Sequence, residues 1–150
     1  MSPIEVQKKT TSRTAKLLTD AVATMGTVTP ADAHGRTMRM DIHDVVRELN
    51  STLGPTLVAG LAGVKDRKLP IRWAKPDGPI TRPEASNRLT FAHRQWTVLF
   101  AADGAAVARQ WLIGGNPYLR ENTPISAIRE DRHSEVAAAV QAFVTGNIDM

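Results

Sequence analysis

LGPTLVAGLAGVKDRKLPIRW, residues 53–73, is the stretch from which the fold can be predicted. Pro55 can open a helix at its first position, where the missing N–H costs nothing, and Gly63 tolerates the left-handed turn that ends one. The small side chains of Ala59 and Ala62 allow a second helix to cross closely. The pattern predicts a short buried helix, a tight turn and a further helix, which together form a helix-turn-helix.

The helix after Gly63 is expected almost at once, with Lys65 or Asp66 as its cap and Val64 filling the angle between the helices. Pro70 would break a helix interior. With Asp66 as the cap, Pro70 falls about one turn in, where its missing N–H is best tolerated. A kink or a later helix start stays open. Trp73 is assigned to the core rather than to base stacking.

Basic residues are concentrated around this second helix. Residues 65–94 contain eight Lys and Arg against three Asp and Glu, whereas residues 103–150 contain four against six. An excess of positive charge on a helix-turn-helix indicates DNA binding. We expect major-groove contacts from Lys65, Arg67, Lys68 and Arg72 and phosphate contacts from Lys75, Arg82 and Arg88. The alternative is an ordinary helical hairpin whose charges face water.

Helical patterns surround this motif, and no strand pattern competes with them. Residues 41–53 place apolar side chains on one face, with Asp41 as N-cap, and residues 84–102 form the longest predicted helix after a proline-rich loop at 75–83. The fold class is therefore all-α. We expect a partly flexible N-terminal arm at 1–40 with one short helix at 15–25, a helix-turn-helix region at 41–95 and a small helical domain at 96–150.

The segment WLIGGNPYLRENTP, residues 111–124, separates two alanine-rich helical stretches. Gly114 and Gly115 can end the helix predicted at 105–114, and Pro117 prevents its continuation. Thr123 is a plausible N-cap, with Pro124 opening a helix that leads into VAAAVQAFV. We expect the aromatic and apolar members to fold back onto the helix and the polar members to face solvent. These polar members are Asn116, Arg120, Glu121 and Asn122. A rigid connector without further function is the alternative.

This segment also carries a family resemblance. Its W-L-x-G-x-N-P-x-L pattern, followed by T-P-I at 123–125 and an Ala/Val-rich helix, resembles the toxin-binding domain of the Xre/MbcA/ParS-type antitoxins. The stretch LGPTLVAGLAGVKDRKLPIRW with the later Arg88 and Leu89 is similar to the degenerate Xre-like helix-turn-helix of the same family. The resemblance covers about residues 41–145.

The resemblance implies a type II antitoxin that neutralises a RES-domain toxin, an enzyme that consumes NAD⁺, and that represses its own operon by binding operator DNA. Pro70 in the expected recognition helix departs from the family's pattern, and we expect it to weaken DNA reading. The resemblance also implies that residues 145–150 form a plug for the toxin cleft, and that Trp111 is mainly structural. The implied toxin-binding residues are Trp111, Asn116, Pro117, Tyr118, Leu119, Arg120, Pro124, Asn147, Ile148, Asp149 and Met150. A stand-alone DNA-binding regulator on the same scaffold is the alternative.

Other classes of function have little support in the sequence. The four histidines have no metal-binding spacing, and neither a G-x-S-x-G motif nor a phosphate-binding loop occurs, so we expect neither an enzyme nor a metal or cofactor site. The chain has no cysteine and hence no disulfide. No apolar stretch is long enough to cross a bilayer, and we expect a cytoplasmic protein. Because a helix-turn-helix usually reads paired half-sites, we expect a homodimer or higher oligomer.

Overall fold

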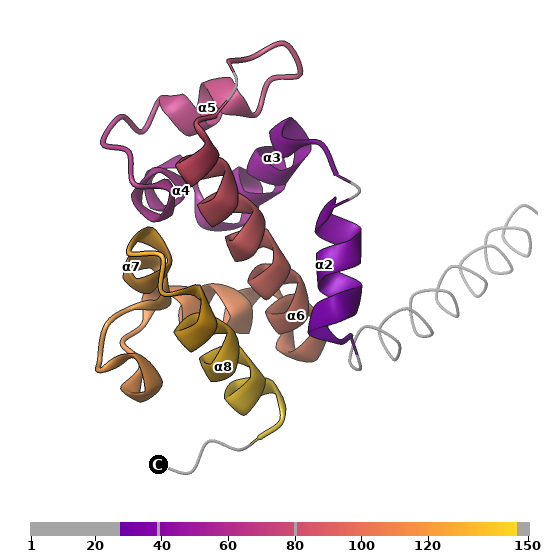
Figure 1. Cartoon of the computed structure of the whole chain (residues 1–150), viewed down its shortest axis with the longest axis vertical. Coiled ribbons are helices and arrows are strands. Elements are labelled where there is room, and N and C mark those ends of the chain that lie inside the picture. The colour runs from indigo at the N-terminus through magenta and orange to yellow at the C-terminus, as the bar shows by residue number, and fades with distance from the viewer. Residues whose placement is uncertain (1–27, 39, 80, 147–150) are drawn as a thin grey trace, which may run out of the picture.

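The computed structural model describes residues 28–38, 40–79 and 81–146. All regular elements of these residues are helical, which confirms the all-α fold class (Figure 1). The elements are α2 (Pro30–Met38), α3 (Ile42–Leu53), α4 (Pro55–Ala62), α5 (Leu69–Trp73), α6 (Pro83–Ile113), the 3-10 helix η1 (Pro117–Leu119), α7 (Pro124–Arg129) and α8 (His133–Val144). The helix expected at 15–25 lies outside the described residues.

Helices α3 and α4 begin and end where the local sequence signals place them. The Asp41 carboxylate accepts a hydrogen bond from the backbone N–H of His43 at 2.8 Å, so Asp41 is the N-cap of α3. Pro55 occupies the first turn of α4, and Gly63 ends that helix in the left-handed region at φ 84°. These signals act within one helical turn, and no distant contact overrides them.

Helix α5 has only five residues, and α3 holds it in place through hydrogen bonds to its backbone. Asn50 donates from its side-chain amide to the Pro70 carbonyl at 2.9 Å. Arg47 donates to the Ala74 carbonyl at 2.8 Å. The His43 Nδ1 lies 2.7 Å from the Trp73 carbonyl, an acceptor, so this nitrogen donates. Side chains from successive turns of α3 thereby satisfy the Trp73 and Ala74 carbonyls at the end of this short helix, while the Pro70 carbonyl also accepts from the Ala74 N–H at 3.1 Å.

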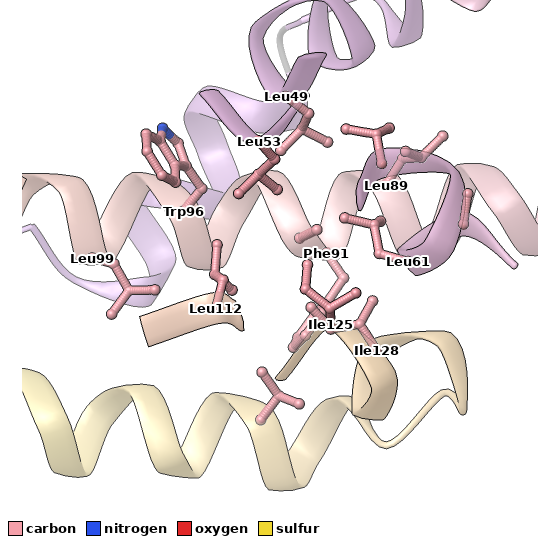
Figure 2. Packing of buried hydrophobic residues seen from close by; sticks show 14 of the residues in the cluster. Leu49, Leu53, Leu61, Leu89, Phe91, Trp96, Leu99, Leu112, Ile125 and Ile128 are labelled. Carbon is pink, nitrogen blue, oxygen red and sulfur yellow. The ribbon is translucent and has the colours of Figure 1, made fainter. Parts of the chain in front are cut away.

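Helix α6 is the centre of the core, because α2, α3, α4, α7 and α8 all pack against it. Figure 2 shows Leu89, Phe91 and Trp96 of α6 among leucines of α3 and α4 and isoleucines of α7. The helix departs from helical geometry at Gly104, with φ 85° and ψ 177°, so two helical parts meet there as the sequence predicts. Residue 96, where we expected a second domain to begin, lies within the first part. A single buried cluster runs through both sides of it.

Residues 30–38 belong to the expected N-terminal arm, but they form helix α2 and pack against α6. Helix α2 buries Ala33, which belongs to the core cluster, and Thr37, which makes a polar contact. The buried Thr37 hydroxyl lies 2.7 Å from Nδ1 of His93, and Nε2 of the same ring lies 2.5 Å from a carboxylate oxygen of Glu48 on α3. The sequence pattern of residues 26–37 lacks an apolar stripe, which is why this helix was not predicted.

The C-terminal helix expected from Thr123 onward is divided into α7 and α8. Thr123 caps α7 as predicted, since its hydroxyl accepts from the Ser126 N–H at 3.1 Å, and Pro124 is in the first turn. The helix then stops before Asp131, which has a left-handed φ of 62°. The prediction of one continuous helix is wrong because Glu130, Asp131 and Arg132 form a turn that lets α8 fold back toward α6.

Candidate nucleic-acid and partner-protein surfaces

Three of the four side chains expected in the major groove are not on a helix. Helix α5 begins at Leu69, so Lys65, Arg67 and Lys68 lie in the connection that follows Gly63. Pro70 is the physical reason, because a residue without an N–H fits only the first turn and so fixes the helix start near itself. The later start that the sequence left open is therefore the observed one. The connection spans more residues than the three or four typical of a helix-turn-helix.

Two of the predicted DNA-binding arginines already have partners in the protein. Arg88 donates from Nε and Nη2 to the Asp131 carboxylate at 3.0 and 3.1 Å, and from Nη1 to the Ala62 carbonyl at 2.9 Å. This hydrogen bonding raises the pKa of Arg88 and lowers the pKa of Asp131. Arg72 lies 3.0 Å from Asp66. Arg88 thus joins the end of α4 to the α7–α8 turn and is not available for a phosphate.

The remaining predicted cations form the basic end of the molecule, near α5 and the start of α6. All are exposed, and within the described residues none of their side chains makes an ion pair or hydrogen bond: Lys65, Arg67, Lys68, Lys75 and Arg82. Positive charge that is not neutralised by the protein itself is suited to an anionic partner. Trp73, which we assigned to the core, is indeed buried, with 5% of its surface exposed.

The 111–124 segment forms a compact turn around Asn116. The Asn116 side chain accepts from the Tyr118 N–H at 2.9 Å, and the backbone N–H and carbonyl of Asn116 bond to Asn122 and Glu121. Asn116 is therefore buried, and its expected outward orientation is wrong because its polar groups close the turn. Leu119 is fully buried, as expected, and Pro124 is also buried.

The exposed residues of this segment are Gly115, Pro117, Tyr118, Arg120, Glu121 and Asn122, so Arg120, Glu121 and Asn122 face outward as expected. Tyr118 exposes 47% of its surface, although it was expected to fold back, and Arg120 has a left-handed φ of 57°. Trp111, near the end of α6, is half-buried, with its ring 6.2 Å from that of Phe143 on α8. We name Trp111, Pro117, Tyr118 and Arg120 the aromatic corner. Residues 147–150, the expected end of the plug, lie outside the described residues.

Two histidine clusters were not predicted. His93 is completely buried between Thr37 and Glu48, so this arrangement links α2, α3 and α6 rather than meeting a substrate. His133 stacks on Phe91 with ring centroids 4.2 Å apart; its buried Nε2 has no hydrogen-bond partner among the described residues, and a carboxylate oxygen of Asp131 lies 3.8 Å from it. Burial lowers the pKa of His133. Neither cluster has a signature in the sequence, because its members come from distant helices.

Comparison with known proteins does not assign the chain to a family: no protein-family model matches it, and neither does a curated protein or a solved structure. Among the described residues, none of the helices combines the length and the apolar character that a membrane crossing requires.

Proposed function

We propose that this chain is a cytoplasmic antitoxin of a type II toxin–antitoxin pair, which inhibits a RES-type NAD⁺-degrading toxin and represses its own operon. The proposal extends the resemblance of residues 41–145 to the Xre/MbcA/ParS-type antitoxins. The observation that carries it is that the 111–124 motif contains both buried residues, which fix its backbone, and exposed residues, which can contact a partner. Asn116, Leu119 and Pro124 are buried and hold the backbone, while Tyr118 and Arg120 between them face solvent.

The aromatic corner has the composition of a protein-binding surface. Tyrosine, tryptophan and arginine are the residues that most often dominate binding free energy at interfaces. The turn around Asn116 is closed by its own hydrogen bonds, and η1 packs against α8. Such a turn loses little conformational entropy on binding, which favours affinity. Trp111, through its contact with Phe143, supports this surface more than it extends it.

The basic end supports the second part of the proposal, binding of double-stranded operator DNA. Because Lys65, Arg67 and Lys68 lie in a loop, we assign them mainly to phosphate contacts, which position a protein without reading sequence. Arg72 lies on α5 and is therefore the cation best placed to contact a base edge. To do so, it must break its ion pair with Asp66. A homodimer would present two such ends to paired half-sites.

Co-expression with the protein encoded beside this chain tests the antitoxin function. We expect co-purification of the two proteins and suppression of NAD⁺ loss in a purified assay. Tyr118→Ala should weaken the complex by about tenfold or more. The matched control is Phe100→Ala, since Phe100 is an aromatic residue of similar exposure on α6, at 40%. A chain ending at residue 144 tests the plug. Absence of a complex, or an equal effect of both substitutions, contradicts the proposal.

The basic end also favours a second candidate, a DNA-binding regulator without a toxin partner. Both candidates predict retardation of the chain's own promoter DNA, with an affinity that falls steeply as salt rises. Lys68→Gln should reduce the slope of log affinity against log salt concentration by about one, the amount expected for one lost phosphate contact. Arg109→Gln, on the second part of α6, should leave this slope unchanged. DNA binding together with failure to bind the neighbouring protein would favour the regulator.

A further inference from the structure

A cleft of about 490 Å³ opens at the basic end, between the connection after Gly63, helix α5 and the start of α6. Its volume is within the range of about 300–1,000 Å³ usual for small-molecule sites. Its apolar walls come from Val64, Leu69, Trp73, Pro79 and Ala85, and its charged groups from Lys65, Asp66 and Arg82. This cleft plays no part in the contacts proposed for the toxin.

The charges of the cleft do not cancel one another. Asp66 is its one carboxylate among the described residues, and both its oxygens are occupied. One oxygen pairs with Arg72 at 3.0 Å, and the other accepts from the backbone N–H of Lys68 at 2.9 Å. Lys65 and Arg82 have no such partner within the described part of the chain. The cleft therefore presents two cations whose charge is not neutralised locally.

The apolar wall is preformed. Trp73 exposes only 5% of its surface, and its backbone carbonyl is held by His43 from α3. The adjoining turn of α5 is held by the bond from Asn50 to the Pro70 carbonyl. A ligand that enters the cleft finds these groups already in place, so little of its binding free energy is spent on ordering them.

We infer that this cleft binds a small organic anion, in which a flat or branched apolar body lies against Val64, Leu69 and Pro79 and a carboxylate, sulfonate or phosphate group lies between Lys65 and Arg82. An inorganic anion would leave the apolar wall in contact with water. A neutral apolar compound would leave both cations without a partner. The two features together specify an amphiphilic anion.

A regulatory consequence rests on the proposed function. Lys65 and Arg82 are also among the residues assigned to DNA phosphates. An anion held between them would occupy the same positive charge, and ligand and DNA would compete. The ligand would then act as an inducer of the operon. Binding to the cleft itself is measured without DNA, so it can succeed or fail independently of the antitoxin proposal.

The experiment is calorimetric titration of the full chain with naphthalene-2-sulfonate, beside the neutral analogue 2-naphthalenemethanol and inorganic phosphate. We expect saturable binding of the sulfonate, and binding about tenfold weaker or worse for the other two. Arg82→Gln and Lys65→Gln should each weaken sulfonate binding by about tenfold. Their matched controls, Arg109→Gln and Lys75→Gln, remove the same charges from exposed positions outside the cleft and should change it by less than about twofold.

A filling variant makes the test independent of charge. Val64→Phe places a larger side chain at a partly exposed position in the wall of the cleft and should abolish binding while the chain keeps its helical circular dichroism. The inference is overturned if the neutral analogue binds as well as the sulfonate, or if each cleft substitution matches its control. It is also overturned if no saturable binding occurs below about 5 mM, which corresponds to roughly 3 kcal/mol.

Discussion

Leu119 and Tyr118 are neighbours in sequence, and replacing each with alanine should have opposite consequences. Leu119 is fully buried in the core cluster, whereas Tyr118 is 47% exposed. Leu119→Ala turns a buried isobutyl group into a methyl group. At about 0.8 kcal/mol per buried carbon, the lost transfer free energy is about 2.5 kcal/mol. The cavity left behind brings the expected loss of unfolding free energy to about 3 kcal/mol, within the range of about 2–5 kcal/mol measured for such substitutions.

Thermal unfolding by calorimetry measures this difference. For a chain of this size, 1 kcal/mol corresponds to roughly 2–4 °C, so Leu119→Ala should lower Tm by about 6–12 °C. Tyr118→Ala should lower it by no more than about 2–4 °C, because substitutions at exposed positions rarely exceed about 1 kcal/mol. In the binding assay Tyr118→Ala should weaken the complex with the partner protein, although the stability of the variant is almost unchanged. Equal Tm values for the two variants would refute the assignment of Leu119 as the anchor of the turn.

Three further predictions concern a turn, a cap and a titratable group. Gly63→Ala should cost roughly 1–2 kcal/mol or more, because φ is 84° and the added carbon collides with the Arg88 guanidinium; denaturant unfolding measures this, and no change would contradict it. Thr123→Ala removes the hydroxyl that accepts from the Ser126 N–H and should cost about 1 kcal/mol by the same assay, whereas Thr123→Ser should retain the cap. Burial lowers the pKa of His133, so the unfolded chain binds the proton more readily, and stability should fall as pH drops below about 6.5. His133→Gln should remove the part of the pH dependence of stability that comes from His133. An unchanged dependence of unfolding free energy on pH would contradict this prediction.

Local signals in the sequence predicted most helix boundaries. Asp41, Pro55, Gly63 and Thr123 act on the backbone within one turn of themselves, through a side-chain hydrogen bond, a missing N–H or a left-handed φ. The same holds for Asn116, whose neighbouring glycines and proline indicated a structured turn. The direction of the Asn116 side chain was predicted wrongly, because a polar residue faces inward when the turn itself supplies its partners.

Long-range partners could not be predicted. Arg88 looked like one of several exposed cations, but Asp131, which is 43 residues away in the sequence, holds it. His93 meets Thr37 and Glu48 across 56 and 45 residues. Such pairs depend on how whole helices cross, and the charge pattern along the sequence does not specify that crossing. For the same reason the cleft of the basic end was not foreseen.

The sequence by itself determined that the chain is helical, where most of its helices begin and end, and that its positive charge gathers around residues 65–94. Each of these properties depends on neighbouring residues or on composition. Only the tertiary structure decided which charges remain available, which member of the 111–124 motif is buried, and that residues 30–38 join the core. The physical reason is that burial and ion pairing are set by the packing of distant helices around α6, so they come into existence only when the chain has folded.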